Sequence, residues 1–418
     1  MKTAEAIERY AEANLFDRAG LMMSGIDSHT HQPFERDFIT PIKVPRRAQF
    51  DPWSYWTYED SVMSMGLYVD GLVLKYQATG EQACLDRAQQ IVETIMKVYS
   101  CSQVHGKGTF LRPYGGFETM HQFMEPLGTD QSSPLFSGLY RYLPHASDAE
   151  ARELRRMMLR SLEWYEQQDF SYFYYKSLIH RSTPGDPIAN HTNSYYFPAI
   201  AWAAHQDQDA ARWQEHLEAW LERFRTGAYP VYPKGSFQPT FCWGSDLPIL
   251  KDILGDRFDE LFTEEKLDQA FSHAREILTR YDEPGVVRRL CPESAEPGFQ
   301  PSIADKSTWG VLGFAYSHTR HQGRTRPRHE IDFLLALAAI GYRSEETAGL
   351  AAELMAHRKA VPRDFTAFLS EDYEKLPETV HLYARSVGVS MLGWWRNVWL
   401  LANVMKGTTA AMTASPCL

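Results

Sequence analysis

Residues 57–78, TYEDSVMSMGLYVDGLVLKYQA, decide how this chain folds. Apolar residues recur there at helical spacing with small residues between them, which predicts an inner helix packed closely against its neighbours. Thr79 and Gly80 end this helix. Residues 81–100, EQACLDRAQQIVETIMKVYS, begin with an acidic residue and predict a second helix with a more polar face. Together the two segments predict a helical hairpin with an inner and an outer helix.

The same order of segments, an apolar stretch followed by an amphipathic one, returns along the chain. It is found at 130–143 with 147–167, 191–205 with 208–225, 241–255 with 264–280, and 328–341 with 344–358. The first helix, 3–20, has no partner before it and the last, 383–405, has none after it, so we pair these two. The pattern predicts an all-α fold, an (α/α)6 toroid or barrel of about six helical hairpins.

No linker or low-complexity run divides the 418 residues. We therefore predict a single catalytic barrel domain over residues 1–406 and a disordered tail over 407–418. Two stacked helical domains are the alternative organisation. The Pro/Gly-rich stretches 105–129, 227–240 and 282–306 fall between hairpins, where long loops often carry function.

The overall composition disfavours several classes of function. With 44% apolar and 23% charged residues, the chain is that of a globular protein. A net charge of −10 at pH 7 disfavours a nucleic-acid surface and, more mildly, an anionic membrane surface. No apolar stretch approaches the ~20 residues that span a bilayer. The N-terminal sequence MKTAEAIERYAEANLF predicts an acidic amphipathic helix rather than a secretory signal. We therefore predict a cytoplasmic protein, or an exported one whose leader has been removed.

Signatures of metal or cofactor binding are missing from the sequence. The five cysteines are odd in number and show neither CxxC nor metal-ligand spacing. The histidines also lack metal-ligand spacing. There is no P-loop, no GxGxxG after a strand, no HExxH and no GxSxG motif. We therefore predict no metal and no other cofactor.

If the inner helices are parallel, their N-terminal ends meet at one mouth of the barrel. The segments there combine aromatic with polar or charged residues: YWTYED (55–60), GTDQSSP (128–134), NHTNSYY (190–196), FCWGSD (241–246), RTRPRHE (324–330) and HLYARS (381–386). Helix capping explains the Ser, Thr and Asp residues, but not the aromatic, histidine and arginine residues. Aromatic residues make up 13% of the chain, and their faces stack on sugar rings, although large helical cores also use them. We therefore predict a carbohydrate site at this mouth.

Two carboxylates are the leading catalytic candidates, because glycoside chemistry needs a proton donor and often a base. Asp130 opens an inner helix after a Gly-rich loop, and Asp60 is expected one turn inside its helix. A helix cap or a solvated carboxylate are the structural alternatives for these two residues. The doublet Glu59–Asp60 can send only one side chain into the lumen.

A further set of side chains is predicted to bind the substrate by stacking, hydrogen bonding or ion pairing. The set consists of Trp56, Tyr58, Arg112, Gln131, His191, Asn193, Tyr195, Trp243, His329, Arg385 and Trp394. His329 belongs to the basic run SHTRHQGRTRPRHE (317–330), which could pair with the carboxylate of a uronic acid or be a solvated loop.

Two stretches of the chain resemble the six-hairpin glycosidases, in particular the unsaturated glucuronyl and rhamnogalacturonyl hydrolases. Asp60 begins a helix that runs to ATGEQACLDRAQQI (78–91), similar to the first hairpin of that family. Asp130 in TDQSSPLFSGLYRYL (129–143) is similar to the second, where an aspartate at the start of the inner helix is the general acid/base. STWGVLGFAYSHT (307–319) resembles a Ser-Thr-Trp stretch that lies on an earlier hairpin in those enzymes, and its arginine is missing here.

The resemblance implies a glycoside hydrolase for short, uronic-acid-containing oligosaccharides, with Asp130 as proton donor and Asp60 as its partner. Hydrolases of ordinary, saturated glucuronides share the barrel. Three other functions stay open. A polysaccharide lyase could use NHTNSYY (190–196), and a sugar epimerase could use His329 with His381. A non-enzymatic sugar-binding or scaffold protein is the third. We expect an oligosaccharide as partner, no nucleic acid and no membrane, and leave a homodimer open.

Overall fold

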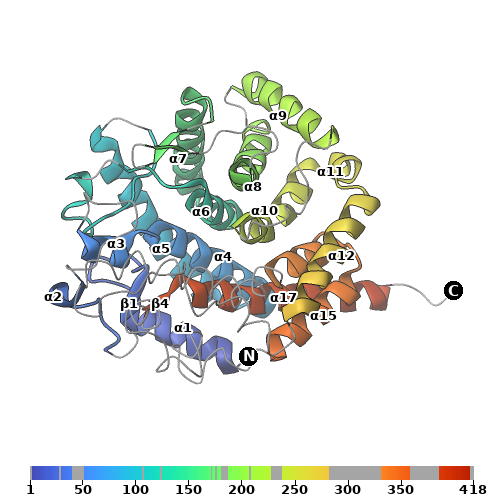
Figure 1. Cartoon of the computed structure of the whole chain (residues 1–418), viewed down its shortest axis with the longest axis horizontal. Coiled ribbons are helices and arrows are strands. Elements are labelled where there is room, and N and C mark those ends of the chain that lie inside the picture. Colours follow the sequence, from blue (N-terminus) through green and yellow to red (C-terminus); the bar gives the residue numbers. More distant parts are fainter. Residues whose placement is uncertain are drawn as a thin grey trace, which may run out of the picture.

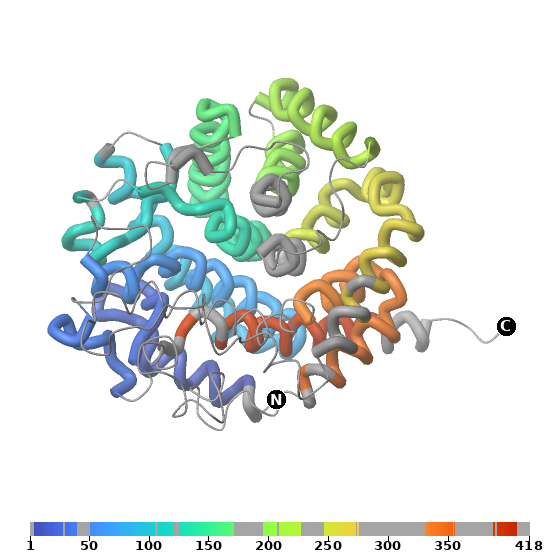
Figure 2. Tube along the Cα trace, in the orientation of Figure 1, coloured from blue at the N-terminus to red at the C-terminus, as the bar shows by residue number. Residues whose placement is uncertain are grey.

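The computed structural model describes residues 2–27, 30–39, 51–105, 108–122, 125–170, 172–174, 177–179, 187–206, 209–226, 238–281, 331–357 and 386–414. Within these residues the chain is predominantly helical, with short strands only (Figures 1 and 2). None of the described helices combines the length and the apolar character needed to cross a bilayer.

The long helices occur where the hairpin pattern predicts them. They are α1 (Lys2–Asn14), α4 (Ser61–Thr79), α5 (Gln82–Ser102), α6 (Thr129–Tyr142), α7 (Asp148–Gln167), α8 (Pro187–Ala203), α9 (Ala210–Arg225), α10 (Gln238–Leu254), α12 (Glu264–Tyr281), α15 (Ser344–His357) and α17 (Val389–Ala414). Short helices are α2 (Arg36–Ile39), α3 (Pro52–Tyr58) and α11 (Asp256–Leu261). Two antiparallel strand pairs join β1 (Gly25–Asp27) to β4 (Ser386–Gly388), and β2 (Tyr172–Tyr174) to β3 (Ser177–Ile179).

Helix α4 is the centre of the packing, as its all-round apolar sequence predicts. It contacts α5, α6 and α17. Its glycines allow close approach: a Cβ on Gly66 would lie 2.5 Å from the Cα of Leu135 in α6, and one on Gly71 would lie 2.2 Å from the Trp395 ring in α17. The helix ends at Gly80, whose φ of 77° is left-handed, in agreement with the predicted Thr-Gly stop.

Helices α4 and α6 run parallel, because contacts near their starts and near their ends join equivalent turns. Asp60 contacts Gln131 at the start of the pair, and Asp70 contacts Arg141 further along. Helices α6 and α10 are also parallel, since Ser133 contacts Asp246 and Tyr140 contacts Asp252. The N-terminal ends of α4, α6 and α10 therefore point the same way.

Helix α17 runs parallel to α4 as well. Arg396 contacts Asp70, and the Asn403 amide donates to the carbonyl of Leu74 at 2.8 Å. Helix α17 also contacts α1, which agrees with the predicted pairing of the first and last helices. It continues to Ala414, so the helix extends past residue 406, where we had placed the end of the domain. The alanines of residues 407–414 favour this helical continuation.

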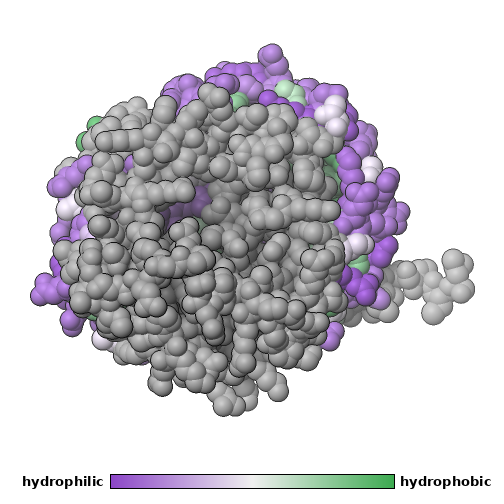
Figure 3. Space-filling view, in the orientation of Figure 1, coloured by the Kyte–Doolittle hydropathy of each residue, from purple (hydrophilic) through white to green (hydrophobic). Residues whose placement is uncertain are grey.

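The amphipathic helices lie outside the apolar ones. In Figure 1, α7 and α9 lie at the periphery, whereas α8 and α10 lie nearer the middle. Helix α5 buries Ile91, Ile95 and Val98 on one face, as its sequence predicts. The described residues that are visible at the rim of Figure 3 are mainly hydrophilic, as expected for the outward faces of such helices.

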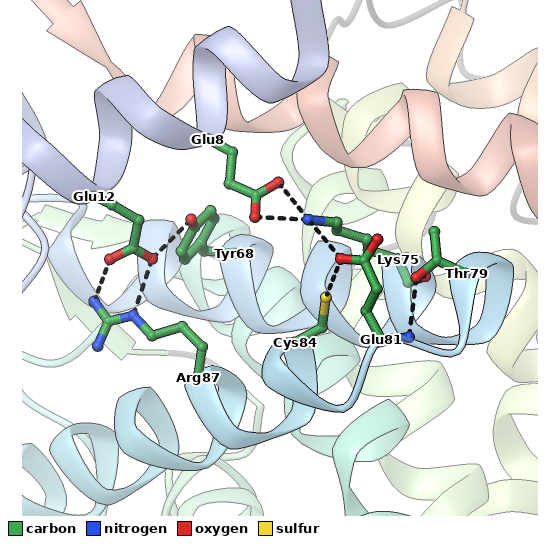
Figure 4. Close-up of polar contacts among 8 residues, drawn as sticks. All are labelled: Glu8, Glu12, Tyr68, Lys75, Thr79, Glu81, Cys84 and Arg87. Atoms are coloured by element: carbon green, nitrogen blue, oxygen red, sulfur yellow. Dashed lines mark hydrogen bonds and ion pairs between the residues drawn. The ribbon is translucent and has the colours of Figure 1, made fainter. Parts of the chain in front are cut away.

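Polar contacts fasten α1 to the first hairpin (Figure 4). The Lys75 ammonium of α4 lies 2.8 Å from a carboxylate oxygen of Glu8. The Tyr68 hydroxyl and the Arg87 guanidinium both donate to Glu12, each at 2.9 Å. Helix α1 is therefore held to α4 by the pair of Glu8 with Lys75. It is held to both α4 and α5 by its Glu12 carboxylate, which binds Tyr68 and Arg87.

Candidate active site

The two predicted catalytic aspartates lie at the adjacent N-terminal ends of α4 and α6. Asp60 occupies the N-cap position of α4, with φ −101° and ψ 18°, and its side chain makes no capping hydrogen bond. It does not lie one turn inside the helix, as we expected, because the chain first forms α3 and then turns at residues 59–60. Asp130 lies in the first turn of α6, whose N-cap is Gly128. Both aspartates are partly exposed.

Gln131 bridges the two helix ends. Its amide nitrogen donates to Asp60 Oδ1 at 2.6 Å and to the carbonyl of Glu59 at 3.0 Å. Its amide oxygen accepts the Gly128 N–H at 3.1 Å, which holds the side chain at the start of α6. Gln131 was predicted to contact the substrate, but the structure buries it and directs its amide to Asp60.

Glu59 and Asp60 point to different partners. The Arg112 guanidinium donates to Glu59 at 2.7 Å and to the Tyr114 hydroxyl at 3.3 Å. Arg112 is 1% exposed, so in this structure it cannot reach a substrate carboxylate as predicted. It instead compensates the negative charge that lies next to Asp60.

The environment of Asp60 favours its protonated form. Burial raises the pKa of Asp60 to about 7, and the neighbouring charge of Glu59 contributes in the same direction. The hydrogen bond from Gln131 partly opposes this shift. The negative charge of Asp130 raises the pKa of Asp60 further, while Arg112 lowers it. Asp60 and Asp130 are therefore electrostatically coupled.

Residues far away in the sequence hold both aspartates in place. The Asp60 N–H donates to the Ser24 hydroxyl at 2.7 Å, and the Ser24 N–H donates to the carbonyl of Thr57 at 2.7 Å. The Tyr165 hydroxyl of α7 donates to the carbonyl of Leu127 at 2.9 Å, directly before α6. We did not identify Ser24 or Tyr165 from the sequence. No local pattern marks them, because their contacts depend on the tertiary fold.

Most of the described aromatic candidates are buried and contact other residues of the protein. The Tyr58 hydroxyl donates to Asp17 at 3.0 Å, and Tyr195 packs edge-on against Tyr165. Trp394 is also buried. These side chains would have to become exposed to stack on a sugar ring as predicted. Trp56 is partly exposed and packs against the cluster of Phe34 and Ile39.

Several predicted residues lie outside what the structure describes. The backbones of α8 and α10 are described, but the side chains of His191, Asn193 and Trp243 are not. His329, with the rest of the basic run 317–330, and Arg385 also lie outside the described residues. Among the side chains that are described, no group of three or more His, Cys, Asp or Glu residues could hold a metal ion.

A second group of charges lies further along the same helices, in the protein interior. Asp70 of α4 accepts hydrogen bonds from Arg141 of α6 and from Arg396 of α17, and we call these three residues the interior cluster. Burial alone would raise the pKa of Asp70, but the two guanidinium groups hold it below its ordinary value. This carboxyl therefore stays charged.

Comparison with known proteins does not assign the chain to a group. No protein-family model, no curated protein and no solved structure matches it.

Proposed function

We propose that this protein is a glycoside hydrolase for short, uronic-acid-containing oligosaccharides, built on an (α/α)6 barrel. Asp130 is the general acid/base, and Asp60 is the partner that sets its protonation or orients the attacking water. The observation that carries the proposal is the arrangement of these two carboxylates at parallel helix ends, where Gln131 bridges from Asp130's helix to Asp60.

Glycoside hydrolysis needs one carboxyl group that supplies a proton and a second that stays charged. Because the pKa of Asp60 is about 7, this carboxyl is partly protonated near neutral pH. Asp130 lies in the first turn of α6 and is coupled to Asp60 by charge, so the pair can hold one proton that Asp130 transfers to the substrate. The coupled pair therefore offers a proton and a negative charge in one partly exposed site.

The surroundings of the pair suit a sugar substrate. Trp56 lies four residues before Asp60 and is partly exposed, so its ring can stack on a sugar face. The resemblance to the unsaturated glucuronyl hydrolases implies that Asp130 is the catalytic aspartate. The uronic-acid preference follows from that resemblance and from the basic run 317–330.

One structural observation disfavours the lyase alternative in the form that uses Tyr195 as the base. Tyr195 is 4% exposed, and burial raises its pKa well above the ordinary value. A tyrosine that removes a proton must reach the substrate and must ionise readily. Tyr195 does neither in this structure.

The test is to incubate the protein with unsaturated and with saturated uronic-acid oligosaccharides. Release of reducing ends and the absorbance of the unsaturated uronate are followed together. Loss of this absorbance indicates an unsaturated-uronyl hydrolase, and new reducing ends without any absorbance change indicate a hydrolase of saturated sugars. A rise in absorbance indicates a lyase, and a product of unchanged mass indicates an epimerase.

Asp130→Asn is predicted to lower kcat by about 10²- to 10⁴-fold, because it removes the group that transfers the proton. The matched control is Asp148→Asn, which changes an exposed aspartate in the first turn of α7. Normal turnover by Asp130→Asn on every accepted substrate would show that the assignment is wrong. Tight sugar binding without any turnover would indicate a binding protein instead.

A further inference from the structure

A cavity of about 1040 Å³ lies at the opposite end of the inner helices from Asp60 and Asp130. It is lined by Gln77 of α4, Arg141 of α6, Trp202 of α8, Asp252 of α10 and Arg155 of α7, together with adjoining residues. Arg141 comes eleven residues after Asp130, which is about 16 Å along a helix. We call this cavity the C-terminal groove, because its lining comes mainly from the C-terminal turns of α4, α6, α8 and α10.

The charged side chains that line the groove are those of Arg141, Arg155 and Asp252. Arg141 lines the groove and also donates to Asp70, but Asp70 is shared with Arg396. Asp70 is therefore one carboxylate facing two guanidinium groups. Nη2 of Arg141 is buried and has no hydrogen-bond partner among the described residues. A buried guanidinium N–H without an acceptor is unfavourable, and the exposed 17% of the Arg141 side chain is the part that a ligand in the groove can contact.

Two other buried carboxyls lie near the interior cluster and accept hydrogen bonds from residues outside it, and Asp246 also interacts with the charges of Arg396 and Arg141. Asp246 accepts from Ser133, and burial raises its pKa well above the ordinary value, so its neutral form is favoured. Asp332 accepts from the side-chain amide of Asn397. Asp252 lines the groove itself, but it accepts a hydrogen bond from Tyr140.

The rim of the groove adds a second cation. Arg155 is exposed and makes no ion pair within the described part of the chain. On the same helix, Arg156 pairs with Glu153 and Arg160 pairs with Glu163, whereas the exposed Arg152 resembles Arg155 in having no ion pair among the described residues.

Neutral polar groups complete the lining. His145 and His205 both line the groove and are exposed. His205 Nδ1 lies 2.7 Å from the carbonyl oxygen of Ala201, so Nδ1 carries the proton and Nε2 is left for another partner. Gln77 and Gln206 add amide groups, and the Tyr140 ring forms part of the wall. This combination of aromatic, amide and cationic groups suits a small polar anion rather than an apolar molecule.

We propose that the C-terminal groove binds a small organic anion that carries a carboxylate or a phosphate group. Arg141 and Arg155 neutralise the anion, and the histidine and glutamine side chains hydrogen-bond to the rest of the ligand. This site is separate from the Asp60–Asp130 pair, so it does not depend on the proposed hydrolase activity.

To test this, the full-length protein is titrated at constant pH with glucuronate, with inorganic phosphate and with neutral glucose. Binding is followed by the ring NMR signals of His145 and His205, which the variants His145→Gln and His205→Gln assign. The proposal predicts saturable shifts of these signals with at least one anion and none with glucose. Saturation by glucuronate alone identifies a carboxylate site, and saturation by phosphate alone identifies a phosphate site.

Arg155→Gln is expected to weaken anion binding about fivefold, since it removes one exposed charge pair with the ligand. The matched control is Arg152→Gln, one turn earlier on α7, exposed and outside the groove. Asp130→Asn should bind the anion as tightly as the unmodified protein. Absence of saturable shifts with both anions, equal shifts with glucose, or unchanged affinity in Arg155→Gln would overturn the proposal.

Discussion

Asp60 and Asp70 belong to the same helical segment, yet their surroundings shift their pKa values in opposite directions. Burial raises the pKa of Asp60 to about 7, and its hydrogen-bond donor is the neutral amide of Gln131. Burial acts on Asp70 in the same sense, but two guanidinium groups outweigh it and keep this pKa below the ordinary value. The comparison shows that the charge of the partner, more than burial, decides whether a carboxyl on this helix can exchange a proton.

The two positions therefore suit different tasks. At Asp60, the neutral partner and the nearby carboxylates leave the proton exchangeable near neutral pH, as acid–base chemistry requires. In the interior cluster, the fixed charges of Arg141 and Arg396 join α4, α6 and α17 through one carboxylate.

The largest effect on stability is expected from Asp70→Asn, which leaves two buried guanidinium groups without a counter-charge. The free energy of unfolding should fall by about 3–5 kcal/mol. The corresponding change at the first aspartate, Asp60→Asn, should alter the free energy of unfolding by no more than about 1 kcal/mol, because Asp60 is already partly neutral. Urea unfolding at neutral pH measures both. Equal losses for the two variants would contradict the distinction between these sites.

The next effect in size, a change in the pKa of Asp60, is expected from Gln131→Leu, which removes the amide that stabilises the Asp60 carboxylate. The pKa of Asp60 should rise by about one unit, since a hydrogen bond contributes about 1 kcal/mol. The pH profile of kcat/KM should then shift to higher pH on the limb that Asp60 controls. The control is Gln122→Leu, which changes an exposed glutamine at the end of the short 3-10 helix Met120–Gln122 and should leave the profile in place.

The smallest effect on stability is expected at Lys75, a third charged residue on α4, which is more exposed than Asp70. Its pair with Glu8 fastens α1, and its partners keep access to water, so Glu8→Gln should lower the free energy of unfolding by at most about 1 kcal/mol. Glu5→Gln, at an exposed position on α1, serves as the control. A loss as large as that of Asp70→Asn would show that exposure does not govern the strength of these pairs.

The fold was predictable where helical periodicity is strong. The apolar pattern and Thr79-Gly80 predicted α4, its end and the following α5, and the parallel inner helices followed from the repeated hairpins. The break between α3 and α4 was not predictable, because it depends on Ser24, which binds the Asp60 N–H from a turn near the N-terminus. Residues 282–330 and 358–385 lie outside the described part of the chain, so closure into a barrel stays a prediction.

The two carboxylates of the candidate site could be predicted from the sequence, but the residues that hold them in place could not. Asp60 and Asp130 stood out because they mark the starts of two inner helices. Residue type alone did not reveal that Arg112 turns inward to Glu59, or that Gln131 binds Asp60 rather than a sugar. Tyr195 stands in a polar, aromatic segment, but the packing of α7 against α8 buries it.

The most direct test of the acid–base pair is to follow the side-chain carboxyl signals of the protein, labelled with ¹³C at aspartate, as the pH is changed. We expect one aspartate signal that titrates at about pH 7. This signal should disappear in Asp60→Asn and remain in Asp148→Asn. Its midpoint should fall in Asp130→Asn, because the charge of Asp130 raises the pKa of Asp60. If no aspartate titrates within about one unit of neutral pH, or if the midpoint is unchanged in Asp130→Asn, the two residues do not act as a coupled pair.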